Sequence, residues 1–195
     1  MKVLDNLKTY KIMLASASPR RRELLAMLGL DFEIATGKEV DESFPKEMLV
    51  EDVAQFLSRK KADAYVVDMS ADELIITADT VVINGGKVLG KPSNALEAAD
   101  MLRSLSGKTH KVITGVTIST KVKQISFSAV TEVEFACLED NEITEYVSVF
   151  KPFDKAGAYG IQEWIGCIGV KNINGSYYNV MGLPLHRLYS ELKNF

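Results

Sequence analysis

Residues 12–25 of this 195-residue chain read IMLASASPRRRELL. The apolar run over residues 11–15 is typical of a short buried strand. A helix is predicted over residues 19–28, because Ser18 stands where an N-cap belongs and Pro19 suits the first helical position. In open α/β sheets, ligands usually sit at such a strand-to-helix turn.

Three arginines, Arg20, Arg21 and Arg22, stand at the start of the predicted helix. Free backbone N–H groups give the first turn of a helix a partial positive charge, so added cations are unfavourable there unless an anion joins them. The helix N-terminus, serine hydroxyls and arginine side chains would together bind a phosphate group. The alternative is that all three arginines face water, and Arg22 is the one most expected to do so.

Further strands and helices follow along the chain. Strands are predicted over residues 74–78, 81–83, 111–119 and 124–135, and helices over residues 48–67, 94–105, 139–150 and from residue 184 onward. Asn84-Gly85-Gly86 supplies a hairpin turn. The mixture predicts an α/β or α+β chain. No Pro/Gly/Ser-rich linker divides the chain. The composition therefore does not test our interpretation that the chain forms two lobes around a cleft.

Composition and charge argue against several classes of protein. The chain has 23 Lys and Arg against 26 Asp and Glu, a net charge of −3, which argues against a broad nucleic-acid surface. No apolar run approaches the roughly 20 residues of a membrane helix, and residues 1–10 lack the apolar core of a signal peptide. A cytoplasmic protein with no nucleic-acid or membrane partner is expected. Cys137 and Cys167 lack metal-ligand spacing and are expected to be partly buried thiols.

Several charged residues stand out against their surroundings. Asp79 and Thr80 lie inside the apolar run IITADTVVI, where a carboxylate is costly unless it is paired or binds a metal. A structural salt bridge is the alternative for Asp79. Lys61 lies beside the apolar stripe of a predicted helix, so it either snorkels to the surface or reaches into a cleft. Glu42 lies in a segment without clear periodicity, where solvated surface is the ordinary expectation, and Lys91 lies in a Gly/Pro turn.

Residues 154–164 read DKAGAYGIQEW. Glycines let the backbone approach a ligand closely, and the amide of Gln162 can present a donor and an acceptor to a base edge. A simple glycine-rich turn is the alternative. The sequence has no GxSxG elbow and no Walker loop, so cations together with carboxylates favour metal-assisted chemistry on a phosphate ester or anhydride.

Taken in order, LASASPRRRELL, ADTVV, GKP, LSGKTH, DKAGAYGIQ and NGSYYNVMGLPL resemble the Maf family of nucleoside triphosphate pyrophosphatases. The resemblance implies an α/β fold with a mixed sheet, flanking helices and two lobes around a central cleft, related to inosine triphosphate pyrophosphatases. It implies one such domain over residues 11–195, preceded by a variable extension over residues 1–10. It also suggests a homodimer.

The resemblance implies an activity and a site. Family members hydrolyse a nucleoside triphosphate to the monophosphate and pyrophosphate with a divalent cation, for which Mg²⁺, Mn²⁺ and Co²⁺ are candidates. Asp79 matches the catalytic carboxylate and Glu42 a second acidic position, so these two are the expected metal ligands. The residues that match the family's substrate-binding positions are Ser16, Arg20, Arg21, Lys61, Thr80, Lys91 and Gln162.

Arg20, Thr80 and Gln162 are the residues that mark the branch resembling dTTP/UTP pyrophosphatases. After Gln162 the family commonly has glycine, whereas this chain has Glu163-Trp164. This departure affects the shape expected for the loop next to the nucleotide base, and so the substrate preference. Two alternatives stay open. One is a non-catalytic nucleotide-binding regulator linked to cell division, as the family's older name, septum-formation inhibitor, suggests. The other is a house-cleaning enzyme for modified pyrimidine nucleotides.

Overall fold

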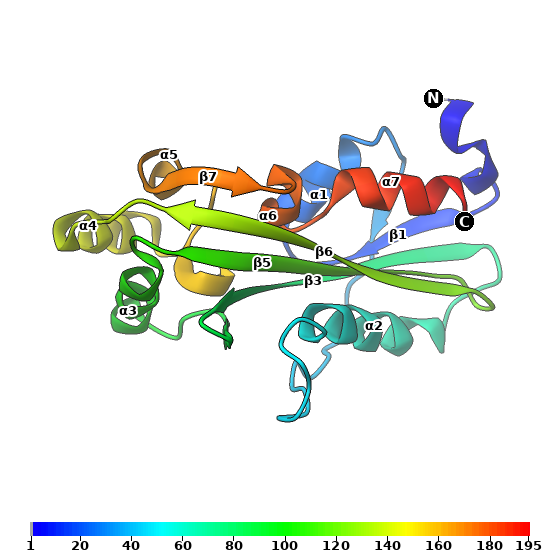
Figure 1. Cartoon of the computed structure of the whole chain (residues 1–195). Coiled ribbons are helices and arrows are strands. Elements are labelled where there is room, and N and C mark those ends of the chain that lie inside the picture. The colour runs from blue at the N-terminus through cyan, green and yellow to red at the C-terminus, as the bar shows by residue number, and fades with distance from the viewer. Residues whose placement is uncertain (1) are drawn as a thin grey trace. The chain divides into compact units, whose positions relative to one another are not determined.

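The computed structural model describes residues 2–195, and Met1, the first residue of the expected extension, lies outside the described part. Seven strands form one mixed sheet in the order β2-β1-β3-β5-β6-β7, with β4 paired to β3 (Figure 1). The strands are β1 (Lys11–Ala15), β2 (Glu33–Ile34), β3 (Glu73–Asn84), β4 (Lys87–Leu89), β5 (Thr109–Ser119), β6 (Gln124–Phe135) and β7 (Val170–Asn174). The predicted α/β class with a mixed sheet is confirmed.

Helices accompany these strands along the chain. They are η1 (Lys2–Leu7), α1 (Pro19–Ala26), α2 (Val53–Val66), α3 (Ala95–Leu105), α4 (Asp140–Phe150), η2 (Ala156–Ala158), α5 (Trp164–Gly169), α6 (Tyr177–Met181) and α7 (Leu185–Lys193). In the described residues, no helix is long and apolar enough to cross a membrane.

The chain divides into two compact units. The first unit comprises Met1–Asp79, Thr114–Ala129 and Gly182–Phe195, and the second comprises Thr80–Ile113 and Val130–Met181. The expectation of a single domain over residues 11–195 stays a prediction.

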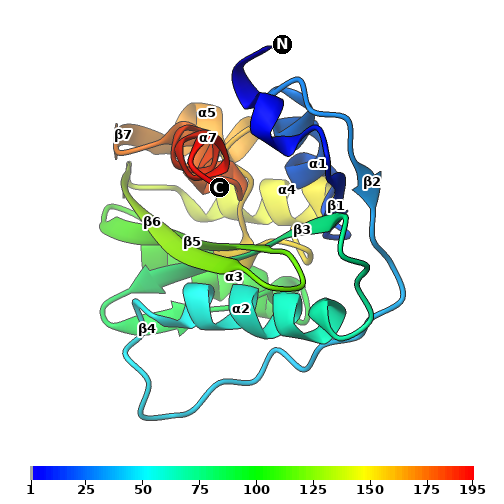
Figure 2. The same cartoon turned by 90° about the vertical axis from the view of Figure 1, so that its right-hand side faces the viewer.

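Parallel strands build the first unit. β1 pairs in parallel with both β2 and β3, with Leu14 opposite Ile34 and Ala15 opposite Thr77. The carboxyl ends of β1 and β2 therefore lie beside the middle of β3, near Thr77. Figure 1 and Figure 2 both show α2 on one face of these strands and α1 and α7 on the opposite face. This layering buries the apolar strand residues, as the run at residues 11–15 predicts.

Polar contacts and one glycine fix α2 on its sheet face. Thr77 Oγ1 donates to Ser58 O at 2.7 Å, and the hydroxyls of Ser58 and Thr117 lie 2.9 Å apart. All three residues are buried. A Cβ atom at residue 115 of β5 would lie only 2.3 Å from the backbone of Ala54 in α2, so the helix approaches as closely as it does only because residue 115 is glycine.

We expect Gly115→Ala to destabilise the fold by about 1–3 kcal/mol, because the added methyl group forces α2 away from β5. Urea unfolding of the variant and the unmodified protein measures this change. Gly90→Ala is the matched control, because a Cβ at residue 90 meets no atom within 4 Å. Equal loss of stability in the two variants would contradict the packing argument.

Aromatic and aliphatic side chains fill the core of the second unit. The core includes Val82 of β3, Leu102 of α3, Phe135 of β6 and Tyr146 of α4. His110 is buried in it, with Nε2 2.8 Å from Tyr159 Oη and its ring edge-to-face with Phe135. No hydrogen-bond partner for His110 Nδ1 occurs among residues 2–195.

Burial lowers the pKa of His110 from its ordinary 6.5 to about 4. Between these pH values the unfolded chain binds a proton that the folded chain excludes, so the free energy of unfolding falls as the pH drops. We expect the free energy of unfolding to fall by a contribution on the order of 3 kcal/mol from His110 between pH 6.5 and 4. The variant His110→Gln should lack this contribution. Urea unfolding of both proteins across this range measures the effect, and parallel pH curves for the two would contradict it.

The structure corrects two expectations. The predicted helix over residues 48–67 begins only at Val53, because turns precede it, one of them closed by the bond from Asp52 N–H to Leu49 O at 2.9 Å. Cys137 and Cys167 are exposed and not partly buried. Cys137 follows the end of β6, and Cys167 lies on α5 between buried Ile165 and Gly169 but on the other face of the helix.

Candidate active site

Several predicted site residues of the first unit lie near the place where β1 ends beside β3. Ser16 follows β1, and Asp79 lies on β3 two residues beyond Thr77, which pairs with the last residue of β1. The segment that follows β2 contains Glu42. Ligands bind outside the carboxyl ends of parallel strands because loops from neighbouring strands meet there. The parallel register thus brings together segments from three separate parts of the sequence.

Arg21 connects two of these segments with a third, which precedes α7. Its Nη1 donates to Ala78 O at 2.9 Å and lies 3.4 Å from Ser16 Oγ, while its Nε donates to Gly182 O at 2.9 Å. Burial lowers the pKa of Arg21, and the nearby charge of Asp79 opposes this shift. Arg21 thereby ties the turn after β1 to β3 and to the segment before α7. The two arginine side chains that flank it differ, since Arg20 is half-buried and Arg22 is exposed, as expected for Arg22.

The turn after β1 uses its serines differently from the sequence expectation. Ser18 is the N-cap residue of α1, but its side chain makes no capping hydrogen bond. Instead the backbone N–H of Ser18 donates to Ser16 Oγ at 3.2 Å. The Ser16 hydroxyl therefore contacts both the start of the helix and the guanidinium of Arg21.

Asp79 is a buried carboxylate with a cationic partner. The residue is 8% exposed, and its Oδ1 lies 2.5 Å from Lys61 Nζ. Thr77 and Asp79 point to the same face of β3, because side chains two residues apart share a face. That face packs against α2, where Ser58 and Lys61 are one turn apart. The contact between Ser58 and Thr77 thus aligns Lys61 with Asp79.

Lys61 also holds Glu42. Its Nζ lies 2.8 Å from Glu42 Oε1, so a single ammonium group bridges two carboxylates. The neighbouring Lys60 pairs with Asp41 at 3.1 Å and donates to Ser43 O at 3.2 Å. Hydrogen bonds from Ser43, together with Lys60, lower the pKa of Asp41 to about 2. Two consecutive lysines of α2 therefore order a loop in which the sequence shows no periodicity.

The remaining predicted residues belong to the second unit. Thr80 follows Asp79 on β3 and is half-buried, while Lys91 and Gln162 are exposed. Gly157 N–H donates to Gly90 O at 3.0 Å, which links the turn that carries Lys91 to the segment that leads to Gln162. A Cβ at residue 157 would lie 2.9 Å from Val82, so glycine is needed where this segment meets β3. The structure thus joins the Lys91 and Gln162 segments within the second unit.

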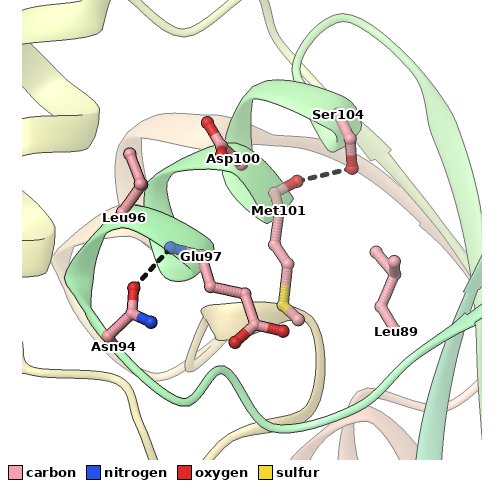
Figure 3. A pocket seen from close by; sticks show the side chains of 7 residues that line it. All are labelled: Leu89, Asn94, Leu96, Glu97, Asp100, Met101 and Ser104. Carbon is pink, nitrogen blue, oxygen red and sulfur yellow. Dashed lines mark hydrogen bonds between the residues drawn. The ribbon is translucent and has the colours of Figure 1, made fainter.

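A separate pocket of about 400 Å³ lies beside α3 in the second unit (Figure 3). The side chains of Leu89 and Met101 and the hydrogen bond from Glu97 N–H to Asn94 Oδ1 border it. Its lining residues are Leu89, Asn94, Leu96, Glu97, Asp100, Met101 and Ser104. None of these lining residues is a predicted site residue.

The two expected metal ligands, Asp79 and Glu42, both belong to the first unit. Residues 2–195 contain no cluster of three or more His, Cys, Asp or Glu side chains arranged to hold a metal. The pair formed by Asp79 and Glu42 nevertheless attracts one cation, the Lys61 ammonium. Mg²⁺ is usually bound by one or two carboxylates together with substrate phosphates and water, so this donor pair fits a metal that arrives with a nucleotide.

A model of the Maf-like protein family matches residues 11–195. This chain belongs to the Maf family. A protein of Phocaeicola vulgatus named dTTP/UTP pyrophosphatase is 57% identical over 191 residues, covering 98% of this chain and 99% of the relative. Proteins with the same name from Bacteroides fragilis and Porphyromonas gingivalis are 54% and 52% identical, and each alignment covers 98% or more of both chains.

Among solved structures, a HAM1 protein from Coxiella burnetii aligns with this Maf chain at a TM-score of 0.48 and 15% identity, covering 95% of this chain and 100% of that one.

The sequence patterns did not reveal residues that support the candidate site. Ser58 and Thr117 align α2 with the sheet. Each is a single polar residue in an apolar run, so the sequence did not predict that the two hydroxyls contact each other. Lys155 and Glu163 of the second unit form an ion pair of 3.0 Å beside Gln162. The departure from glycine at residue 163 is the one sequence signal that pointed there.

Proposed function

We propose that this Maf-family chain hydrolyses dTTP and UTP to the nucleoside monophosphate and pyrophosphate. The observation that carries the proposal is the group formed by Asp79, Lys61 and Glu42 in the first unit. Arg21 joins this region to the turn after β1 through its contacts with Ala78 O and Ser16 Oγ. Relatives named dTTP/UTP pyrophosphatase, 52–57% identical over nearly the whole chain, support the same activity.

The basic residues bind the polyphosphate. Ser16, Arg20 and Arg21 hold one phosphate group at the N-terminus of α1, and Lys61 and Lys91 neutralise the remaining charge of the substrate and of the leaving pyrophosphate. Phosphoryl chemistry of this kind depends mainly on positioning and charge stabilisation. A site without histidine or cysteine is therefore sufficient.

Asp79 carries the chemical step. The oxygen of a water molecule bonds to the α-phosphorus, the bond from this phosphorus to the bridging oxygen breaks, and pyrophosphate leaves with the electron pair. Asp79 orients the water and accepts its proton at a carboxylate oxygen. Asp79 and Glu42 would hold the divalent cation, Mg²⁺, Mn²⁺ or Co²⁺, which supplies positive charge to the phosphates and the attacking water when it is bound.

Base recognition belongs to the second unit. Uracil and thymine present acceptor, donor and acceptor groups in sequence, and the amide of Gln162 can pair with two of them. Thr80, next to Asp79 in the chain, is the second specificity residue. A site built on such hydrogen bonds rejects bases that lack the matching groups, because its own polar groups are then left without partners.

The test is pyrophosphate release from a panel of UTP, dTTP, CTP, ATP, GTP and modified pyrimidine triphosphates, with Mg²⁺ and with EDTA. We expect kcat/KM for UTP and dTTP to exceed that for the other common nucleotides by about 10² or more, and EDTA to abolish turnover reversibly. Comparable rates on all common nucleotides would contradict the specificity. Tight UTP binding without turnover would support the regulator alternative. The homodimer and the cytoplasmic location stay predictions.

A further inference from the structure

The carboxylate of Glu163 lies at the centre of a polar cluster in the second unit. Its Oε1 is 3.0 Å from Lys155 Nζ, and its Oε2 accepts a hydrogen bond from Tyr146 Oη. The Lys155 side chain is 9% exposed and that of Glu163 25% exposed, so water screens this ion pair only weakly. Tyr146 of α4 is fully buried. The cluster is therefore anchored in the core of the unit.

The same cluster contacts the backbone just before Gln162. Gly160 N–H donates to Tyr146 Oη at 3.0 Å, and a Cβ atom at residue 160 would lie only 2.7 Å from Glu163 Cδ. The carboxylate thus packs directly over the backbone of Gly160. A Cβ atom at this position would displace the Glu163 carboxylate from its present contacts.

Glu163 also closes the turn that presents Gln162. Its backbone N–H donates to Gly160 O at 3.0 Å, which makes Ile161 and Gln162 the two central residues of a four-residue turn. Ile161 is buried and Gln162 is exposed. The inward side chain of Ile161 fixes the orientation of the turn, and Glu163 fixes its position through both its backbone and its side chain.

We propose that Glu163 is a positioning residue for base recognition, which holds the turn of Gln162 in place through Lys155, Tyr146 and the backbone of Gly160. The inference rests on the proposed function, because it requires Gln162 to contact the base. A displacement of about 1 Å in such a contact is enough to cost up to about 10²-fold in rate. Loss of the Glu163 carboxylate therefore weakens discrimination between bases without touching the groups that act on the phosphates.

The experiment compares kcat/KM for UTP and CTP, because cytosine carries a donor where uracil carries an acceptor. Gln162→Ala is expected to lower the UTP/CTP ratio by about 10²-fold, and Glu163→Ala to approach that value. Glu163→Gln keeps an acceptor for Tyr146 but loses the attraction to Lys155, so a loss of about tenfold is expected. The change should appear mainly as a higher KM for UTP, with kcat/KM for CTP nearly constant.

A double-mutant cycle separates positioning from general damage to the fold. If Glu163 acts through Gln162, the double variant Gln162→Ala/Glu163→Ala has the same ratio as Gln162→Ala alone. Glu145→Gln, an exposed carboxylate next to Tyr146 on α4, is the matched control and should leave the ratio unchanged. Should Glu163→Ala fold poorly, Glu163→Gln carries the test by itself.

Each outcome decides the matter. An unchanged UTP/CTP ratio in the Glu163 variants, or equal losses on both nucleotides, would overturn the positioning role and leave the proposed function intact. Failure of the unmodified protein to release pyrophosphate from UTP would instead overturn the proposed function, and this inference with it.

Discussion

Asp79→Asn is expected to lower kcat for pyrophosphate release from UTP by about 10³-fold or more, because it removes both the acceptor for the proton of water and one ligand of the expected metal. The amide occupies nearly the same volume. Lys61 keeps its contact with Glu42 at 2.8 Å, so the variant should still fold. Steady-state pyrophosphate release and a thermal melt, measured on the same preparation, test both statements.

Asp63→Asn is the matched control for this variant. Asp63 lies on α2, is exposed and accepts a hydrogen bond from Gln124 at 2.8 Å, so its charge faces water and Gln124. It should retain nearly full activity. If Asp79→Asn turned over UTP at a near-normal rate, the assignment of Asp79 would be wrong.

Lys61→Met is expected to lower kcat/KM for UTP by about 10²–10³-fold, since a charged group that stabilises the phosphates is lost. Stability should fall as well. Methionine keeps the apolar stem but leaves the Asp79 side chain, which is only 12% exposed, without its cationic partner. Kinetics with UTP and urea unfolding of the same variant measure the two effects.

Arg59→Met on the same helix controls for the loss of a positive charge in general. Arg59 is exposed, so this variant should change neither activity nor stability by much. Similar losses in the two variants would show that the net charge of α2 matters and that the specific contacts of Lys61 do not.

Local patterns in the sequence were sufficient for much of the fold. The hydrophobic run at residues 11–15 and the Ser18-Pro19 cap predicted β1 and the start of α1, because both signals depend only on near neighbours. Helix starts were less certain. The segment before Val53 forms turns although its composition suits a helix, since local propensity does not register how a loop is anchored.

The sequence likewise marked some residues of the candidate site and not others. A carboxylate inside an apolar strand marked Asp79, and crowded arginines marked the turn after β1, because each is costly without a partner. The sequence offered no partner for Lys61 and only a weak reason to select Glu42. Periodicity placed Lys61 beside an apolar stripe, and both snorkelling and an inward role fitted that position.

By itself, the sequence determined most of the longer strands and helices, and it marked the arginine-rich turn at residues 16–21 and the charged position in β3, because these depend on residues close together in the chain. Only the tertiary structure decided that Lys61 bridges Asp79 and Glu42. It also decided that Glu163, next to Gln162, contacts Lys155 and Tyr146. Such contacts join residues from separate elements. Strand register and close helix packing set those distances, and no local pattern encodes them.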